Sequence, residues 1–335
     1  MNVTVIGAGS WGTALSMVLA RAGHDVKIWA REPEIAYRIN NFHENGTYLE
    51  GITLSDAIKS YTDLKECLHD RDIIVFATPS HTMREVATRA LPHLGGNEIV
   101  VSVSKGIEND TFLTMSQVLV EVLKDKIIED HIGVLYGPSH AEEVCRFKPT
   151  LIVSTAYSRR TAQLIQRTFM TPMFRVYVNY DILGVEIAGS VKNVIAIAAG
   201  IVDGADFGDN AKAALLTRGM SEIRRLGTRL GASQETFSGL AGIGDLIVTC
   251  TSEHSRNRYV GYHIGRGERL NDIISRMNMI AEGVKTTKSV YFWGKSLHVD
   301  MPITEAVYRI LFEDVDPKDA VYELMTRNPK EEILS

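Results

Sequence analysis

Lys192 is a basic residue inside a long apolar stretch, a position that suggests chemistry. Residues 183–203 are rich in Ala, Ile and Val, and Glu186 and Asn193 are the nearby polar residues. An ammonium group in apolar surroundings is costly unless it is paired, and burial moves its pKa toward the range useful for proton transfer. Lys192 is therefore a candidate general acid and base. A lysine that reaches the surface, or one in a structural ion pair, would leave the same pattern.

A second polar cluster supplies candidate partners for this lysine. Asp245 follows the glycine-rich bend 239–244, and Ser255-Arg256-Asn257-Arg258 comes shortly after it, with Thr249 between them. Arginine, lysine and backbone amides are the groups that bind a phosphate monoester, and Asp245 can hold Lys192 in place and set its charge. Taken alone, Ser-Arg-Asn-Arg is also typical of a solvated polar loop.

The N-terminal residues carry a glycine turn of the G-x-G-x-x-G type. The apolar, β-branched run 2–6 leads into Gly7, Gly9 and Gly12, and a helical segment follows to about Arg21. The first glycine permits the tight turn, the second admits a pyrophosphate to the backbone, and the third allows close packing of helix on strand. The helix N-terminus adds free N–H groups and a positive dipole. The pattern predicts a dinucleotide site rather than only a tight turn.

The residue after the second strand indicates which dinucleotide is bound. Residues 25–29 form the expected strand, and Ala30-Arg31-Glu32 follows. An acidic residue there would bind the ribose hydroxyls, whereas an arginine accommodates a 2′-phosphate. Arg31 favours NADP(H), and Glu32 keeps NAD(H) open. An ordinary solvated arginine at a strand end remains the alternative.

Further strands place several of these residues together. Apolar runs alternate with helical segments over about 180 residues, the pattern of a doubly wound, Rossmann-like α/β sheet with right-handed crossovers. Residues 33–70 are expected to be helical and polar, with a turn at 45–47. The further expected strands are 72–77, 98–104, 132–136, 150–153 and 174–178. Ligands bind at the carboxyl ends of such strands. We therefore expect the glycine turn, Arg31, Pro79, Lys105 and residues 137–139 to share one crevice.

From residue 181 the sequence changes to an all-α pattern. Residues 183–203 are too interrupted by charge for a membrane span and too apolar for a surface helix, so they predict a central buried helix. Further helices are expected at 211–229, 287–297, 303–312 and 317–325. The predicted division is a nucleotide-binding domain at 1–180 and a helical substrate domain at 181–335.

Composition limits the possible partners. The chain of 335 residues is 45% apolar and 23% charged with a net charge of −5, which argues against nucleic acid or an anionic membrane as a partner. Three separated cysteines, Cys67, Cys145 and Cys250, indicate neither a disulfide framework nor a zinc site, and no metal is expected. Because the first strand follows Met1 at once, we expect no signal peptide and a cytoplasmic protein.

Six motifs in order resemble a known family, the soluble bacterial-type NAD(P)-dependent sn-glycerol-3-phosphate dehydrogenases. They are Gly7–Ala14, Ser104–Gly106, Gly137–Ala141, Ser190–Asn193, Gly242–Leu246 and Ser255–Arg258, with Ala281–Gly283 beyond them. The resemblance runs nearly end to end. It implies reversible hydride transfer between NAD(P)H and dihydroxyacetone phosphate, giving sn-glycerol 3-phosphate for phospholipid synthesis.

The resemblance also implies roles for individual residues. Lys192 would give and take the proton. The residues read by themselves agree, since Asp245 can hold Lys192 in place and Lys105 can fix the substrate or polarise its carbonyl. The cofactor contacts would be Ser10, Trp11, Arg31, Lys105, Ala141, Arg256, Ile280 and Glu282. The substrate contacts would be Lys105, Gly137, Ser139, Lys192, Asn193, Asp245, Thr249, Ser255, Arg256 and Asn257.

Alternatives from other classes remain at this stage. A two-domain β-hydroxy-acid dehydrogenase would share the fold and the buried lysine but would need a carboxylate site. A non-catalytic dinucleotide sensor would need no Lys192–Asp245 pair. A serine hydrolase is disfavoured, because Gly137-x-Ser139-x-Ala141 lacks the second glycine of a nucleophile elbow. The buried apolar helix also suggests a homodimer. His140 and His254 are expected to have no chemical role.

Overall fold

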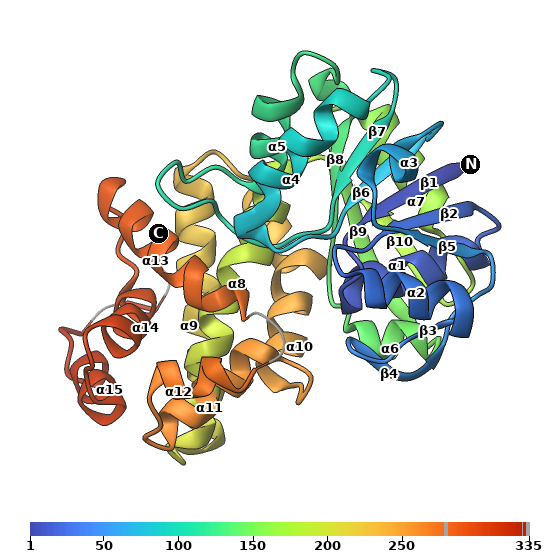
Figure 1. Ribbon diagram of the computed structural model, residues 1–335. Coiled ribbons are helices and arrows are strands. Elements are labelled where there is room, and N and C mark those ends of the chain that lie inside the picture. Colours follow the sequence, from blue (N-terminus) through green and yellow to red (C-terminus); the bar gives the residue numbers. More distant parts are fainter. Residues whose placement is uncertain (278–280, 330, 333–335) are drawn as a thin grey trace.

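The computed structural model describes residues 1–277, 281–329 and 331–332, which form a sheet-containing part and a helical part (Figure 1). The first part holds an eight-stranded sheet with the order β10-β9-β8-β7-β6-β1-β2-β5. Its strands are β1 Asn2–Ile6, β2 Asp25–Trp29, β5 Ile58–Tyr61, β6 Ile73–Phe76, β7 Ile99–Ser102, β8 Ile132–Tyr136, β9 Thr150–Ala156 and β10 Phe174–Val178.

All neighbouring strands of this sheet are parallel except β8 and β9, which pair antiparallel. The chain turns back between β8 and β9 through the short helix α6 (Ala141–Cys145), so β9 runs opposite to β8. Strands β6 and β7 are buried over their whole length, as expected for strands covered on both faces. The predicted doubly wound, Rossmann-like fold class is confirmed.

Helices cover both faces of the sheet. One face packs against α1 (Ser10–Arg21), α2 (Pro33–Phe42), α6 and α7 (Arg159–Phe169), through side chains such as Val3 and Val5. The opposite face packs against α3 (Leu64–Leu68), α4 (Met83–Ala90) and α5 (Met115–Leu123), through Ile6 and Phe76. This division follows from the alternation of side chains along each strand.

The prediction for residues 33–70 was wrong in part. Only α2 and α3 are helical there. Between them lie a hairpin of β3 (Glu44–Asn45) and β4 (Leu49–Thr53) and the edge strand β5. In β5 the buried Ile58 and Ser60 alternate with the exposed Lys59. Four residues with one polar inward side chain carry too little periodic signal to be distinguished from a polar helix.

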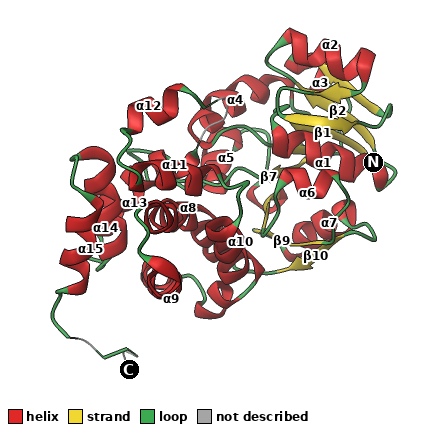
Figure 2. Cartoon of the chain, turned by 90° about the horizontal axis from the view of Figure 1, so that it is seen from below, coloured by secondary structure: helices red, strands yellow, loops and turns green. Residues whose placement is uncertain are grey.

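The helical part is built around α8 (Ile182–Gly204), whose residues from Gly184 to Val202 are all buried. Figure 2 shows α8 end-on, with α9, α10, α11 and α13 around it. The surrounding helices are α9 Gly208–Arg229, α10 Asp245–Thr251, α11 Arg256–Gly265, α12 Leu270–Ser275, α13 Glu282–Ser296, α14 Pro302–Phe312 and α15 Pro317–Met325. α8 is long and apolar enough to span a membrane, but it forms the core of this part. The predicted central buried helix is confirmed.

Candidate functional site

One pocket of about 490 Å³ lies between the sheet edge and the helical part. From the sheet side it is lined by residues that follow strands, among them Gly9 after β1, Arg31 after β2 and Lys105 after β7. From the helical side it is lined by Lys192 of α8 and Arg256 of α11, among others. The crevice predicted at the carboxyl ends of the strands is therefore present, and α8 and α11 close its other side.

The glycine turn has the geometry that a pyrophosphate requires. A Cβ on Gly9 would meet no atom within 4 Å, so the backbone there faces open space in the pocket. A Cβ on Gly12 would overlap the carbonyl oxygen of Gly7, which shows how closely α1 packs against the turn. Gly7 has φ +119°, in the left-handed region that favours glycine. These features fit a dinucleotide at the N-terminus of α1.

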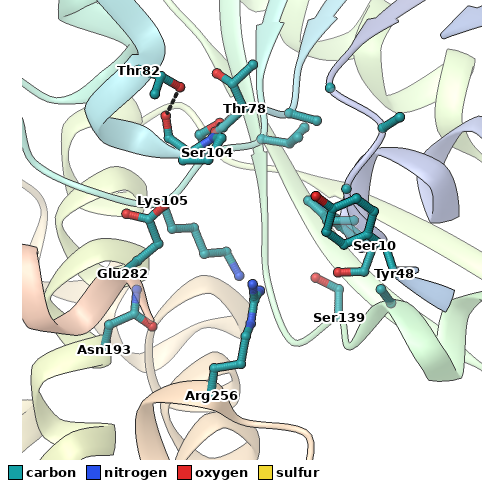
Figure 3. Close-up of a pocket in the computed structure, with 18 of the residues that line it drawn as sticks. Ser10, Tyr48, Thr78, Thr82, Ser104, Lys105, Ser139, Asn193, Arg256 and Glu282 are labelled. Atoms are coloured by element: carbon teal, nitrogen blue, oxygen red, sulfur yellow. Dashed lines mark hydrogen bonds between the residues drawn. The ribbon is translucent and has the colours of Figure 1, made fainter. Parts of the chain in front are cut away.

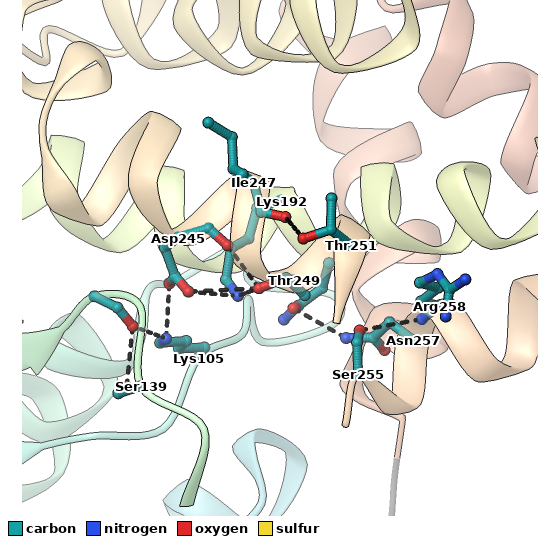
Figure 4. Close-up of polar contacts among 12 residues, drawn as sticks. Lys105, Ser139, Lys192, Asp245, Ile247, Thr249, Thr251, Ser255, Asn257 and Arg258 are labelled. Carbon is teal, nitrogen blue, oxygen red and sulfur yellow. Dashed lines mark hydrogen bonds and ion pairs between the residues drawn. The ribbon is translucent and has the colours of Figure 1, made fainter. Parts of the chain in front are cut away.

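A buried carboxylate joins two lysines at the centre of the pocket (Figure 4). Lys192 Nζ lies 2.9 Å from Asp245 Oδ1, and Lys105 Nζ lies 2.7 Å from Asp245 Oδ2. Lys192 Nζ also donates to Thr249 Oγ1, and Lys105 Nζ donates to the carbonyl of Gly137 at 3.0 Å. Lys192 comes from α8, Asp245 and Thr249 from α10, and Lys105 from the loop after β7. The helical part and the sheet part therefore meet at one charge cluster.

The surroundings of Lys192 tune its charge. Burial lowers the pKa of Lys192 to about 8, and the positive charge of Lys105 acts in the same direction. The nearby Asp245 carboxylate opposes this shift because it favours the charged ammonium. A lysine with a pKa near neutrality can both give and accept a proton, which is the property of a general acid and base.

The N-terminus of α11 forms the second cationic region of the pocket. Ser255 caps the helix by accepting from the backbone N–H of Arg258 at 3.2 Å, and the first-turn N–H groups have no partner within the helix. The Arg256 guanidinium has no ion pair among the described residues, and Figure 3 shows its side chain pointing into the pocket. Asn257 is held by Asn193 at 3.0 Å and by the Gly283 N–H at 2.9 Å. Together these groups form a site for an anion.

The opposite end of the pocket is formed by Arg31, Glu32 and Tyr48. Arg31 Nη2 lies 2.5 Å from Glu32 Oε1 and Nε lies 2.9 Å from the same atom. This hydrogen bond and ion pair raise the pKa of Arg31, which stays positively charged. Tyr48 comes from the loop between β3 and β4 and lies beside Ser10 in Figure 3.

Glu282 links the two parts of the chain at the pocket wall. Its carboxylate accepts the Ser80 N–H at 3.1 Å and the Ser80 Oγ–H at 2.5 Å. Ser80 follows β6, and Glu282 begins α13, 202 residues later. The loop after β6 is therefore fixed by a residue of the helical part.

Most of the predicted site residues line the pocket. Those that do are Gly7, Gly9, Ser10, Trp11, Arg31, Lys105, Ser139, Ala141, Lys192, Asn193, Asp245, Thr249, Ser255, Arg256, Asn257 and Glu282. Gly12 and Gly137 do not line the pocket. Gly12 packs α1 closely against Gly7, and Gly137 contacts Lys105 through its carbonyl oxygen. Ile280 lies outside the described residues.

Several pocket residues were not found from the sequence. The most prominent are Trp29, Tyr48, Thr78, His81, Glu85, Arg89, His140 and His254. The rings of His140 and His254 lie 5.8 Å apart, and burial lowers the pKa of His140. After β6, the pocket-lining positions 82, 85, 86 and 89 recur at helical spacing. This spacing could have indicated that one side of α4 and the residue before it face the pocket.

Comparisons with known proteins agree over nearly the whole chain. A family model described as the N-terminus of NAD-dependent glycerol-3-phosphate dehydrogenase matches residues 2–162, and the corresponding C-terminus model matches residues 181–322. A glycerol-3-phosphate dehydrogenase of the NAD(P)+ type from Salinibacter ruber is 53% identical over 331 residues, covering 99% of this chain and 97% of the relative. One from Chlorobium luteolum is 53% identical over 334 residues, with 99% of both chains covered.

A solved structure gives the same result. The crystal structure of glycerol-3-phosphate dehydrogenase from Coxiella burnetii superposes with a TM-score of 0.92 at 37% sequence identity, covering 97% of this chain and 99% of that one. With two family models in succession and relatives above half identity, the chain belongs to the NAD-dependent glycerol-3-phosphate dehydrogenase family.

Proposed function

We propose that this protein catalyses reversible hydride transfer between NAD(P)H and dihydroxyacetone phosphate, giving sn-glycerol 3-phosphate for glycerophospholipid synthesis. One observation carries the proposal: the pocket joins a dinucleotide turn, a lysine–carboxylate pair and, at a helix N-terminus, an arginine without an ion pair in the part of the chain that the structure describes. A sensor has no need of the lysine pair. A β-hydroxy acid presents a carboxylate, and the further cations here suit the larger charge of a phosphate monoester.

Charge supports the phosphorylated substrate. Lys105, Lys192 and Arg256 line the pocket, and Asp245 is the carboxylate in direct contact with the two lysines. Glu142 and Glu282 also line the pocket, so the support comes from where the three cations lie and not from a net positive charge. Cations at these positions suit a phosphate dianion and the alkoxide that develops at the carbonyl oxygen. Arg256 with Asn257 and the N–H groups of α11 would hold the phosphate. Gly137, Ser139, Asn193, Thr249 and Ser255 would line the rest of the substrate.

Proton transfer falls to Lys192. When bound, the nicotinamide supplies or accepts the hydride at the substrate carbon. In the direction of reduction, protonated Lys192 Nζ donates to the developing alkoxide, and in oxidation the neutral amine takes the hydroxyl proton. Asp245 holds the amine in place and keeps it charged at neutral pH. Lys105 is fixed by Asp245 and Gly137, so it places a second positive charge beside the carbonyl.

The cofactor would lie along the sheet edge. Gly7, Gly9, Ser10, Trp11 and Gly12 would form the pyrophosphate turn, and Arg31 would face the adenosine ribose. Lys105, Ala141, Arg256 and Glu282 would contact the nicotinamide half. The Arg31–Glu32 pair supports use of both forms, because Arg31 suits a 2′-phosphate and Glu32 suits ribose hydroxyls.

The proposal extends to the chain's organisation. We assign nucleotide binding to residues 1–180 and the substrate groups to residues 181–335, in a cytoplasmic homodimer. The strands end at Val178 and α8 begins at Ile182, which supports the boundary. Light scattering at micromolar concentration tests the dimer, and a monomer alone would refute it.

The decisive test compares wild type with Lys192→Met and, as a matched control, Lys295→Met. Lys295 pairs with Glu305 on the exposed side of α13 and α14, away from the pocket. We expect wild type and the control to oxidise NADPH when dihydroxyacetone phosphate is added. Lys192→Met should lose at least about 1,000-fold in kcat while still binding NADPH. No turnover by wild type would refute the function.

A further inference from the structure

We propose that Asp203 is a positioning residue that fixes the phosphate-binding end of α11 relative to Lys192. This inference rests on the proposed function of the pocket. Asp203 lies in the last turn of α8, the helix that carries Lys192, and it binds Arg258 in the first turn of α11. Neither Asp203 nor Arg258 lines the pocket. Asp203 would therefore act on the substrate only through the placement of α11.

The backbones of α8 and α11 are in direct contact. A Cβ on Gly200 would overlap the carbonyl of Arg258, and one on Gly204 would overlap the carbonyl of Tyr262. On the other helix, a Cβ on Gly261 would overlap the carbonyl of Ile197, and one on Gly265 would approach that of Ile201 to 2.5 Å. Each helix thus presents two glycines four residues apart. This contact brings the helices close, but glycines offer no side chain to fix their relative position.

Polar contacts add directional constraints to this packing. Asn193 and Asn257 meet inside the pocket, where a bound substrate would compete for the same amides. Asp203 provides the contact outside it: Arg258 Nε and Nη2 each lie 2.7 Å from Asp203 Oδ2. These side chains are 17% and 23% exposed, so the pair is partly shielded from water. Such a pair with a planar guanidinium is directional.

Arg258 is connected directly to the anion-binding turn. Its backbone N–H donates to Ser255 Oγ, and Ser255 precedes Arg256 and Asn257 at the start of α11. Figure 4 shows Arg258 beside Ser255 and Asn257 and apart from the Lys192–Asp245 pair. Asp203 lies about 16 Å along α8 from Lys192, since each residue adds about 1.5 Å. α8 therefore sets the distance between the proton donor and the phosphate-binding turn, and Asp203 holds α11 at that distance.

Lys212 gives a matched control within the same cluster. Its Nζ lies 2.9 Å from Asp203 Oδ1 and 2.8 Å from Oδ2, but Lys212 belongs to α9 and does not touch α11 through this contact. A variant at Lys212 removes an equally close ion pair to the same carboxylate. If Asp203 matters only for local stability, the variants at Lys212 and Arg258 should behave alike.

The experiment compares Asp203→Asn, Arg258→Met, Arg258→Lys and Lys212→Met. For Asp203→Asn and Arg258→Met, we expect KM for dihydroxyacetone phosphate and the inhibition constant of inorganic phosphate to rise by about tenfold. NADPH binding, followed by fluorescence, should stay within about twofold of wild type. Arg258→Lys should recover part of the loss, and Lys212→Met should match wild type in both constants.

Other results would overturn the proposal. Equal effects of Lys212→Met and Arg258→Met, or a loss of phosphate and NADPH binding in parallel, would indicate a general loss of structure. Melting temperatures measured on the same samples distinguish a general loss of structure from a specific loss of phosphate binding. If wild type does not turn over dihydroxyacetone phosphate, the proposed function fails separately. Calorimetry with inorganic phosphate then tests the role of Asp203 by itself. Unchanged phosphate binding by Asp203→Asn would refute the proposal that Asp203 positions α11.

Discussion

Lys192 Nζ lies 2.9 Å from Asp245 Oδ1, and the two side chains are only 5% and 2% exposed. A buried ion pair of this kind contributes little net stability to the fold, because removing both charges from water is costly. The contribution of this pair is to the chemistry of Lys192. Burial lowers the pKa of Lys192 to about 8, while Asp245 keeps the ammonium charged at neutral pH.

The first prediction is a mirror-image pH dependence for the two directions. Reduction needs protonated Lys192, so kcat for dihydroxyacetone phosphate should fall as pH rises through about 8. Oxidation of glycerol 3-phosphate needs the neutral amine, and its kcat should rise over the same range. Steady-state rates in both directions check this. Lys192 acts here within the cluster that Asp245 forms with Lys105 and Lys192. Flat profiles between about pH 7 and 9 would contradict the role of this cluster.

The second prediction concerns Asp245→Asn. The amide removes the charge that favours protonated Lys192 and leaves two lysines without their shared carboxylate. The pKa of Lys192 should fall further, so the loss of reduction with rising pH should move to lower pH by about one unit. At neutral pH kcat should drop by about 100-fold. NADPH affinity measured by fluorescence serves as the control, since the glycine turn is unchanged. An unshifted profile would show that Asp245 does not control Lys192.

The third prediction separates two glycines of the same turn. Gly9→Ala places a methyl group in open pocket space, so it should leave stability unchanged and weaken dinucleotide binding. Gly12→Ala would collide with the Gly7 carbonyl and should destabilise the protein by about 2 kcal/mol or more. Urea unfolding and fluorescence titration measure the two effects on each variant. Unchanged dinucleotide binding by Gly9→Ala would contradict the assignment of Gly9 to the cofactor.

What the sequence could predict followed from short-range patterns. The predictions of the strand 25–29 and of the buried helix containing Lys192 were correct. Both rest on apolar residues that lie close together in the sequence. The glycine turn was predictable for the same reason. All its parts lie within 21 residues of the N-terminus.

The remaining features depend on contacts between distant segments. The Ser80–Glu282 contact joins residues 202 positions apart, and no local pattern indicates that these two residues meet, although Glu282 itself lies in a recognised motif. Strand β5 takes its place by pairing with β2, not from its own four residues. The sharing of Asp245 by Lys105 and Lys192 likewise requires the sheet and helical parts to be assembled, although each residue was identified separately.

The fourth prediction concerns cofactor choice. Arg31 is largely exposed and paired with Glu32, so a 2′-phosphate can replace Glu32 as its partner. Arg31→Ala should lower kcat/KM for NADPH by about 10-fold or more and leave the value for NADH within about threefold. Glu32→Gln should raise the preference for NADPH, because Arg31 loses its competing partner. Equal losses with both cofactors in Arg31→Ala would show that Arg31 does not discriminate between them.

The fifth prediction is a pH-dependent stability set by Glu222, far from the chemistry. Its buried carboxylate on α9 accepts the N–H groups of Ile303 at 2.6 Å and Thr304 at 3.1 Å, at the start of α14. Burial raises the pKa of Glu222 from 4.5 to about 7, and these hydrogen bonds oppose the shift only partly. Because the folded pKa lies above the unfolded value, the stabilisation is fully present below about pH 4.5 and is lost as pH rises through about 7.

Glu222→Gln removes this titration, while contributions from other groups cancel in the comparison. The unfolding free energy of wild type minus that of Glu222→Gln should therefore decrease by up to about 3 kcal/mol between pH 4.5 and 7.5. Urea unfolding at several pH values measures it. A constant difference for Glu222→Gln would mean that Glu222 ionises alike in the folded and unfolded chains.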